Sequence, residues 1–325
     1  MKKIATLGQM HDDGLKLLKN YKYSIVNISD YSNNNLKDKL KDVDAIALRT
    51  VKLTKDILKE CKSLKIVARH GVGYDNVDLN YLNKEKIALA ITGSANAVTV
   101  AEHVMTMFLN LCKHSKTSDQ IVRSGQFDKK ASMQKDMLEL YKKNIFIIGF
   151  GRIGKTLAKR CVGFESNVFV YDPYIEPNII KAENYFPVSF EEGIKIADFI
   201  SVHLPLNEKT KYLITKKEFS KMKKTCIIVN TARGGIIKEE DLLWALKNHI
   251  IHSAGLDVFE QEPPNKNNPL FNLNNLILSP HSAALTLECR KRMSVETCSN
   301  ILNYLSKSPN LRLSNIVNRE ILSFN

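Results

Sequence analysis

No stretch of this sequence is long and apolar enough to cross a membrane. Its longest apolar runs are as short as residues 43–48, whereas a membrane-spanning helix needs about 20 mostly apolar residues. The N-terminus also lacks the extended apolar segment and small-residue cleavage site of a secretory signal. These absences predict a protein that has no membrane partner and carries no secretory signal.

Closely spaced cysteines are also missing. The six cysteines lie at positions 61, 112, 161, 226, 289 and 298, and none belongs to a Cys-x-x-Cys pair. Zinc sites and disulfide frameworks are recognised by such spacing, so the sequence argues against a metal site and against disulfides. We therefore expect buried free thiols in a reducing, cytoplasmic environment.

Blocks of basic residues are absent, although the formal net charge is +14. The lysines are spread along the whole chain in short groups such as Lys129 and Lys130, and no nucleic-acid-binding motif accompanies them. The pattern is typical of a lysine-rich surface and predicts no nucleic-acid partner. It leaves open a role for part of this charge in attracting an anionic substrate.

A chain of 325 residues with 44% hydrophobic and 25% charged residues is too long for most single cores and predicts two domains. Short apolar runs alternate with stretches of helical periodicity, which is typical of an α/β fold with parallel sheets covered by helices. The expected strands are 4–7, 23–28, 43–48, 64–68 and 87–91 in the first series, and 145–148, 168–171, 199–202, 226–229, 254–256 and 276–278 in the second.

Two longer helices are expected outside these series. Thr99 is followed three residues later by Glu102, which has the form of a capping box and predicts that an apolar helix begins there. A second helix is expected over residues 287–305.

A glycine-rich turn joins a strand to a helix in the second series. Residues 149–154 read GFGRIG, directly after the apolar strand 145–148 and before a helical pattern. Gly149 permits the tight turn, Gly151 leaves room for a pyrophosphate, and Gly154 lets the helix pack closely on the strand. The N–H groups at the start of the helix would then face the phosphates, so the turn predicts a dinucleotide site.

The strand after this helix ends at Asp172, which lies 18 residues beyond the last glycine. Its carboxylate can accept hydrogen bonds from the hydroxyls of the adenosine ribose and would repel a 2′-phosphate. Pro173 and Tyr174 follow it in place of a basic residue. The predicted cofactor is therefore NAD rather than NADP.

Three chemically capable side chains stand just past the ends of expected strands. Arg233, Glu262 and His281 follow strands 226–229, 254–256 and 276–278. Ligands of open parallel sheets bind beyond the carboxyl ends of the strands, so these side chains can converge. Arginine suits a carboxylate, histidine passes a proton near neutral pH, and glutamate favours protonated histidine. Taken singly, each could instead be a surface or loop residue.

Together these features resemble the D-isomer-specific 2-hydroxyacid dehydrogenase family, which includes phosphoglycerate, D-lactate and hydroxypyruvate/glyoxylate enzymes. The matching segments run in the family's order over nearly the whole chain. They are GVGYDNVD at 71–78, Asn96 followed by VAEH at 100–103, GFGRIG at 149–154, HLPL at 203–206, NTARG at 230–234, LDVFEQEP at 256–263 and SPH at 279–281.

The resemblance implies two doubly wound parallel-sheet domains. A flavodoxin-like substrate-binding domain would comprise residues 1–98 and 285–325, and a Rossmann NAD-binding domain of residues 99–284 would be inserted within it. Helix 99–111 and the C-terminal helix would be the crossovers, and the active site would lie in the cleft. Family members are usually homodimers joined through the NAD domain.

The resemblance also implies roles for individual residues. Arg233 would bind the substrate, His281 would be the acid–base group and Glu262 its orienting partner. The substrate-binding residues would further include Arg49, Val72, Gly73 and Asn96. The cofactor would be lined by Thr99, Gly149, Gly151, Arg152, Ile153, Gly154, Asp172, His203, Pro205, Thr210, Thr231, Ala232, Asp257 and Ala283. In this motif His203 is expected to face the cofactor rather than to act as a second catalytic histidine.

The implied activity is hydride transfer between NAD and C2 of a small 2-hydroxy or 2-oxo acid. D-3-phosphoglycerate is the first expected substrate because Arg49 and Lys52 could bind a phosphate, and glyoxylate or hydroxypyruvate and D-lactate are the alternatives. The loop 48–52 looks one residue shorter than in many phosphoglycerate enzymes, which often carry two arginines there.

Two other functions are weighed against this one. A non-enzymatic NAD-sensing co-repressor can share the fold and the catalytic residues. An L-2-hydroxyacid dehydrogenase would carry its glycine turn near the N-terminus rather than at Gly149. The chain ends at Asn325, soon after the last expected helix, which predicts that no regulatory domain follows.

Overall fold

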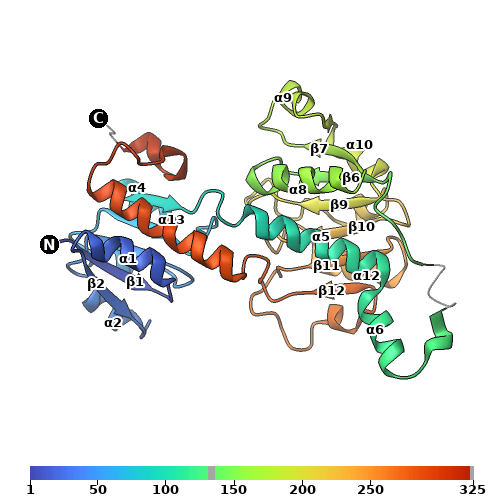
Figure 1. Ribbon diagram of the computed structural model, residues 1–325, viewed down its shortest axis with the longest axis horizontal. Coiled ribbons are helices and arrows are strands. Elements are labelled where there is room, and N and C mark those ends of the chain that lie inside the picture. Colours follow the sequence, from blue (N-terminus) through green and yellow to red (C-terminus); the bar gives the residue numbers. More distant parts are fainter. Residues whose placement is uncertain (131–135, 323–325) are drawn as a thin grey trace. The chain divides into compact units, whose positions relative to one another are not determined.

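The computed structural model describes residues 1–130 and 136–322. The chain divides into two compact units, unit 1 of Met1–Asn96 and Leu285–Asn325 and unit 2 of Ala97–Ala284 (Figure 1). Each unit is built on a parallel sheet with helices on its faces, so the predicted α/β fold with two parallel-sheet bodies is confirmed. Among the helices described, none has the length and apolar character needed to cross a membrane.

Unit 1 has a five-stranded sheet in the order β2-β1-β3-β4-β5. This order places β1 beside β3, so the chain winds first one way and then the other along the sheet. The strands are β1 (Lys3–Leu7), β2 (Ser24–Ile28), β3 (Ala45–Leu48), β4 (Ile66–Arg69) and β5 (Ala88–Ile91). The helices are α1 (Asp12–Asn20), α2 (Asn33–Lys39), α3 (Lys55–Leu58), α4 (Leu79–Lys84), α13 (Leu287–Leu305) and the 3-10 turns η3 (Leu313–Asn315) and η4 (Arg319–Ile321).

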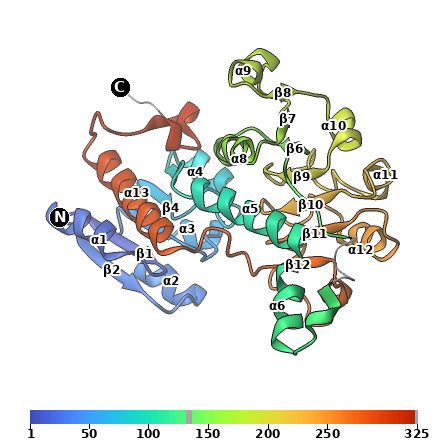
Figure 2. The same cartoon turned by 45° about the vertical axis from the view of Figure 1, so that its right-hand side comes forward.

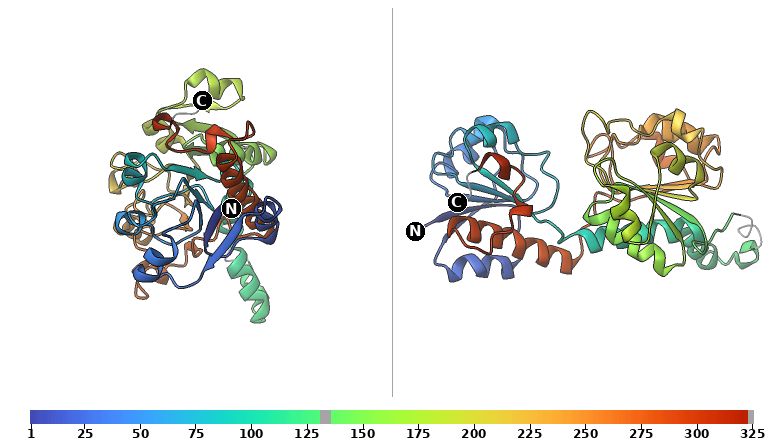
Figure 3. Two further views of the ribbon diagram at one scale, coloured as in Figure 1. Left: turned by 90° about the vertical axis from the view of Figure 1, so that its left-hand side faces the viewer. Right: turned by 90° about the horizontal axis from the view of Figure 1, so that it is seen from above.

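Alternate side chains of the unit 1 strands enter two different cores. Ala45 and Ala47 of β3 face a core that includes Leu18 of α1 and Ile301 of α13, and Ile46 of the same strand faces a core under α2, α3 and α4. Figure 3 shows α1 and α13 together on one face of this sheet. The period-2 alternation of the strands is what allows helices to cover both faces.

Unit 2 has a seven-stranded sheet in the order β12-β11-β10-β9-β6-β7-β8, and all its paired strands are parallel. The strands are β6 (Asn144–Ile148), β7 (Asn167–Tyr171), β8 (Phe186–Pro187), β9 (Phe199–Val202), β10 (Ile227–Asn230), β11 (Ser253–Leu256) and β12 (Leu276–Leu278). The helices are α5 (Ala97–Lys113), α6 (Ser115–Arg123), α8 (Arg152–Gly163), α9 (Pro177–Ala182), α10 (Phe190–Ile196), α11 (Lys216–Phe219), α12 (Glu239–Lys247) and the 3-10 turns η1 (Phe127–Lys129) and η2 (Pro269–Asn272).

The unit 2 sheet is also covered on both faces. Ile145 and Ile147 of β6 pack with α5 and α8, whereas Phe146 and Ile148 pack with the core formed by α10, α11 and α12. Figure 3 shows these two helix layers on opposite faces of the sheet. The direction in which the chain winds along the sheet switches between β6 and β9. Because the strands are parallel, the carboxyl ends of β6, β7, β9, β10, β11 and β12 all lie along the same side of the sheet, where ligands of such sheets bind.

One local expectation was wrong. Helix α5 begins at Ala97, two residues before Thr99, so Thr99 lies buried inside the helix and does not cap it. Ala97 is only 3% exposed, and its burial extends the helix beyond the point that the capping pattern indicates. Tertiary packing therefore overrides the local signal here.

Candidate active site

The glycine turn connects β6 to α8 in the geometry that its sequence predicts. Gly149 has a φ of +99°, and a Cβ at this position would lie 2.8 Å from the carbonyl oxygen of His203. A Cβ at Gly154 would overlap the carbonyl oxygen of Gly149. Gly151 is different, because a Cβ there would meet no described atom within 4 Å. The first and third glycines thus serve packing, and the second borders open space at the N-terminus of α8.

Asp172 ties the end of β7 to this turn. One carboxylate oxygen accepts a hydrogen bond from the backbone N–H of Phe150 at 2.8 Å, and the other accepts one from the N–H of Tyr174 at 2.9 Å. A carboxylate has about four lone-pair positions, so two acceptor positions remain for another partner. The side chain is therefore fixed beside the open space at Gly151 with acceptor capacity left over.

Two buried polar atoms at the same sheet edge lack a hydrogen-bond partner within the described residues. They are Oγ1 of Thr231, directly after β10, and Nδ1 of His203, directly after β9. Buried polar groups are usually satisfied, so such atoms indicate a missing ligand or water. Together with the open position at Gly151, they fit a dinucleotide that lies along the ends of β6, β9 and β10.

His203 is not suited to proton transfer near neutral pH. Burial lowers the pKa of its imidazole to about 3, and its Nε2 lies 2.8 Å from Oγ of Ser201. The backbone N–H of His203 donates to the carbonyl of Ile148, which holds the residue against the glycine turn. Pro205 and Thr210 follow in an exposed turn closed by a 2.6 Å hydrogen bond from the Thr210 hydroxyl to the Pro205 carbonyl.

His281 and Glu262 form a direct pair. His281 Nδ1 lies 2.7 Å from one oxygen of Glu262, and the other oxygen accepts a hydrogen bond from the N–H of Phe259 at 3.1 Å. The side chains are 51% and 38% exposed. His281 has a φ of +50°, an uncommon conformation for a residue other than glycine, and such positions cluster at functional sites. The pair leaves Nε2 of His281 as the ring atom that can meet a substrate.

Asp257 organises the loop that carries His281. Its side chain is buried, and its carboxylate accepts hydrogen bonds from the hydroxyl of Ser279 and from the N–H groups of Ser282 and Ala283 at 2.8 and 3.0 Å. The backbone carbonyl of Asp257 also accepts the N–H of His281 at 2.8 Å. Sequence reasoning assigned no role to Ser279, although it belongs to the SPH segment that was matched.

The Arg233 loop lies against the loop of Glu262. Asn230, the last residue of β10, donates to the carbonyl of Arg233 and accepts the N–H of Ala232, which shapes the turn. A Cβ at Gly234 would overlap the carbonyl oxygen of Phe259. Because the N–H of Phe259 binds Glu262, this close approach brings the predicted arginine and glutamate loops together. Arg233 itself is half-buried, and its Nη1 donates to the carbonyl of Ala232 at 2.7 Å.

A mostly apolar cavity of about 390 Å³ borders the pair. Besides Glu262, Ser279 and His281, it is lined by Phe259, Pro263, Pro264, Phe271, Leu278 and Pro280. An apolar wall beside a hydrogen-bonded imidazole and carboxylate lowers the local dielectric constant and strengthens their interaction.

The predicted substrate-binding residues of unit 1 follow three adjacent strands. Arg49 follows β3, Val72 and Gly73 lie in the loop after β4, and Asn96 follows β5. Oδ1 of Asn96 is another buried polar atom without a hydrogen-bond partner within the described residues.

His70, in the loop after β4, indicates a positive environment at this edge of unit 1. Burial and, after it, the charge of Arg49 lower the pKa of the imidazole to about 4. The ring is therefore neutral near pH 7, and the positive charge at this edge comes from Arg49 and its neighbour Arg69.

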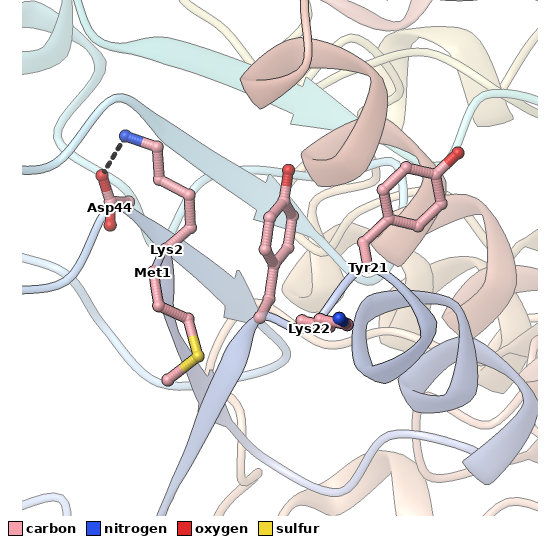
Figure 4. Close-up of a pocket in the computed structure, with 6 residues that line it drawn as sticks. Met1, Lys2, Tyr21, Lys22 and Asp44 are labelled. Carbon is pink, nitrogen blue, oxygen red and sulfur yellow. Dashed lines mark hydrogen bonds and ion pairs between the residues drawn. The ribbon is translucent and has the colours of Figure 1, made fainter.

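Another cavity lies in unit 1, at the end of its sheet opposite to the predicted substrate-binding residues. Figure 4 shows the ion pair of Lys2 and Asp44, whose nitrogen and oxygen lie 2.9 Å apart, on one side of this cavity and Tyr21 and Lys22 on the other. Lys2 precedes β1 and Asp44 precedes β3, so this cavity is at the amino ends of the strands. It is separate from the predicted substrate-binding residues, which lie at the carboxyl ends.

Comparison with known proteins agrees with the geometry. Residues 105–283, more than half of the chain, match the family model described as D-isomer specific 2-hydroxyacid dehydrogenase, NAD binding domain. The chain belongs to this family, whose members are NAD-dependent oxidoreductases, and unit 2 contains its NAD-binding domain.

The relatives differ in how much of their own length this chain spans. The chain is 37% identical to the D-3-phosphoglycerate dehydrogenase of Methanocaldococcus jannaschii over 90% of its own length, but spans only 55% of that protein. It is 36% identical to the hydroxypyruvate reductase of Thermotoga maritima over 90% of its own length and 95% of that protein. The solved structure of D-lactate dehydrogenase from Aquifex aeolicus, complexed with NAD and lactic acid, matches with a TM-score of 0.84 at 26% identity, covering 98% of this chain and 99% of the other.

Proposed function

We propose that this protein is an NAD-dependent D-2-hydroxyacid dehydrogenase that transfers a hydride between nicotinamide and C2 of a small 2-hydroxy or 2-oxo acid. The observation that carries the proposal is the 2.7 Å pair of His281 and Glu262. The pair lies beyond β11 and β12, at the same sheet edge as the glycine turn after β6. A dinucleotide site and an acid–base pair at one edge are what this reaction requires.

His281 is the proposed acid–base group. Bound NAD would supply the hydride chemistry at C2. When a 2-oxo acid is reduced, protonated His281 gives a proton from Nε2 to the substrate oxygen. In the opposite direction neutral His281 accepts that proton at Nε2. Glu262 receives the Nδ1–H and so keeps Nε2 available, and its negative charge stabilises the imidazolium form.

Arg233 is the proposed electrostatic partner of the substrate. Its guanidinium would bind the carboxylate and stabilise the charge that develops on the C2 oxygen during reduction. In unit 1, the backbone N–H groups of Val72 and Gly73 and the side chains of Arg49 and Asn96 are the proposed substrate-binding groups. These assignments are supported by the position of each residue just past a strand end.

The proposed cofactor-binding residues follow the same edge of unit 2. Asp172 would bind the ribose hydroxyls with its remaining lone pairs, and Thr231 and His203 would use their unpartnered buried atoms. The full proposed set is Thr99, Gly149, Gly151, Arg152, Ile153, Gly154, Asp172, His203, Pro205, Thr210, Thr231, Ala232, Asp257 and Ala283.

D-3-phosphoglycerate is the proposed substrate. Arg49 contributes positive charge at the carboxyl edge of the unit 1 sheet, and Lys52 follows in the same loop. The similarity to the Methanocaldococcus D-3-phosphoglycerate dehydrogenase supports this choice. Hydroxypyruvate or glyoxylate reduction is the second candidate, because the Thermotoga hydroxypyruvate reductase is almost equally similar.

A substrate panel tests the proposal. The purified protein is assayed in both directions with NAD(H) and NADP(H), using 3-phosphohydroxypyruvate, hydroxypyruvate, glyoxylate and pyruvate and their D-hydroxy counterparts. We expect the highest kcat/KM with NADH and 3-phosphohydroxypyruvate. A preference for hydroxypyruvate or glyoxylate identifies the second candidate. Tight NADH binding without turnover of any acid would show a sensor rather than an enzyme.

We also propose that the protein is a homodimer joined through unit 2. All nine residues of α6 keep some solvent exposure, and Val122 and the nearby Phe127 are 61% and 59% exposed. Figure 2 shows α6 extending from the end of α5, past β12. Light scattering should give twice the chain mass for the native protein, and the Val122→Asp/Phe127→Asp variant should be monomeric. A monomeric native protein would refute the proposal.

A cytoplasmic location is proposed from the cysteines. All six are buried and carry free thiols, which fits a reducing compartment. Labelling of denatured protein, prepared from cells under thiol-trapping conditions, should therefore find six free thiols.

A further inference from the structure

A chain of hydrogen bonds connects helix α5 to the loop that carries His281. Nε2 of His103, on α5, lies 2.9 Å from Oγ of Ser279. The Ser279 hydroxyl donates to the buried carboxylate of Asp257, and Nε2 of His103 lies 3.8 Å from the same carboxylate oxygen. The roles proposed above leave His103 unused, although its motif is one of the segments that identify the family.

The donors in this chain have one consistent direction. The single hydrogen of the Ser279 hydroxyl is directed to Asp257, so Oγ can only accept from His103, and Nε2 of His103 must carry a hydrogen. In a hydrolase triad the serine hydroxyl would instead donate to the histidine. The order of these three residues therefore excludes Ser279 as an activated nucleophile and indicates a supporting role.

The series of hydrogen bonds from His103 ends on the backbone of the loop that carries His281. Asp257 has no exposed surface, and its carboxylate also binds the N–H groups of Ser282 and Ala283, on the far side of His281. Ser279 lies on the near side, so the loop is held on both sides of the residue. Because His281 has a φ of +50°, its conformation depends on such contacts.

We propose that His103 is a positioning residue for the acid–base pair and acts on His281 through Ser279 and Asp257. This inference rests on the proposed function, because it assigns His281 the proton transfer. Without the Nε2–H of His103, the Ser279 hydroxyl loses the donor that orients it, and its hydrogen bond to Asp257, the loop's side-chain contact on the near side of His281, is no longer held in place. Small displacements of a catalytic group lower the rate of the chemical step more than the affinity for substrate.

Two substitutions of His103 separate positioning from simple packing. His103→Gln keeps a long side chain whose amide N–H can donate to Ser279, whereas His103→Leu keeps bulk without a donor. We expect about tenfold lower kcat for His103→Leu with the KM for the 2-oxo acid changed less than twofold, and His103→Gln within about threefold of the native kcat. Thr106→Leu, at an exposed position one turn further along α5, is the matched control, and its kcat and KM should equal those of the native protein.

A double-mutant cycle tests the route of the effect. If His103 acts through Ser279, Ser279→Ala should lower kcat about as much as His103→Leu, and the double variant should be no worse than either. Native kcat in His103→Leu, equal impairment of His103→Gln and His103→Leu, or additive effects in the double variant would each overturn the proposal.

A readout without substrate or cofactor keeps the inference separate from the proposed function. The ¹H–¹³C signal of the His281 ring, identified by its loss in His281→Gln, should shift or broaden in His103→Leu and stay in place in His103→Gln. An unchanged signal in His103→Leu would overturn the positioning role. If the native protein turns over no acid at all, the proposed function fails, while this spectrum still decides whether His103 positions His281.

Discussion

Replacing Glu262 with glutamine tests the acid–base pair most directly. In the structure the two carboxylate oxygens have two different donors: Oε2 lies 2.7 Å from Nδ1 of His281, and Oε1 accepts the N–H of Phe259 at 3.1 Å. A carboxamide has one oxygen and one NH₂ group, so it cannot accept from both. One of the two hydrogen bonds must break or reverse.

The reversal acts on the chemistry of His281. If the amide oxygen keeps the Phe259 N–H, the amide NH₂ faces Nδ1 of His281 and donates to it. The neutral ring then carries its hydrogen on Nε2, the atom that must accept the proton when a 2-hydroxy acid is oxidised. The ring must therefore change to the other tautomer before each oxidation. The imidazolium that forms in the reaction also loses the stabilising negative charge of the Glu262 carboxylate.

The size of the effect follows from the hydrogen bond that is lost. A hydrogen bond to a charged group contributes about 1.5–3 kcal/mol, and 1.36 kcal/mol corresponds to a tenfold change in rate. The side chains of His281 and Glu262 are 51% and 38% exposed, which places the pair toward the lower part of this range. We therefore expect kcat for oxidation to fall by about 10- to 100-fold in Glu262→Gln.

Initial rates at saturating NAD and 2-hydroxy acid measure this effect, with Glu262→Ala as the control. Alanine removes the carboxylate but leaves Nδ1 to water, so it imposes no tautomer. We expect Glu262→Ala to oxidise the 2-hydroxy acid faster than Glu262→Gln does. Native kcat in Glu262→Gln, or a Glu262→Gln enzyme faster than Glu262→Ala, would refute the reasoning.

Four further outcomes are expected. Gly151→Val should raise the Kd for NADH at least about tenfold, measured by fluorescence titration, without lowering the unfolding temperature, because the new side chain enters open space. Gly154→Val should instead lower the unfolding temperature in calorimetry, because its side chain clashes with the Gly149 carbonyl. Asp172→Ala should lower the ratio of kcat/KM for NADH to that for NADPH at least about tenfold, and an unchanged ratio in steady-state assays would contradict the proposed ribose contact. Arg233→Lys should lower kcat/KM for the 2-oxo acid about 10²-fold, since an ammonium group cannot reproduce the guanidinium fork, and near-native kinetics would count against its role. Burial lowers the folded-state pKa of His70 to about 4, so between pH 6.5 and 4.5 mainly the unfolded chain takes up a proton at this residue, and the stability present above pH 6.5 is lost as the pH falls. Over this range, urea titrations should show that the native protein loses about 2 kcal/mol more unfolding free energy than the His70→Gln variant does.

The features that sequence reasoning located well are local or repeat along a strand or helix. The GFGRIG turn needs only the residues on either side of it, and the glycine positions have the close contacts or open space that each was assigned. The pairing of His281 with Glu262 is long-range, yet it could be expected because parallel strands end at one edge of a sheet. In contrast, the start of α5 could not be read from Thr99 and Glu102, because the burial of Ala97 decides it.

Buried polar residues were the part of the site that sequence alone could not interpret. Asp257 is predicted to line the cofactor because of its place in a motif, and that role stays a prediction; the structure adds that its carboxylate is buried beneath the loop at 279–283 and bonded to that loop's hydroxyl and N–H groups. A sequence shows that a residue can accept hydrogen bonds, not which donors will surround it, because those donors come from positions 22 to 26 residues away. His103 is harder still, since its partner Ser279 is 176 residues distant. The exposed pair therefore follows from residue type and strand order, whereas the groups that hold it in place become visible only when the packing is known.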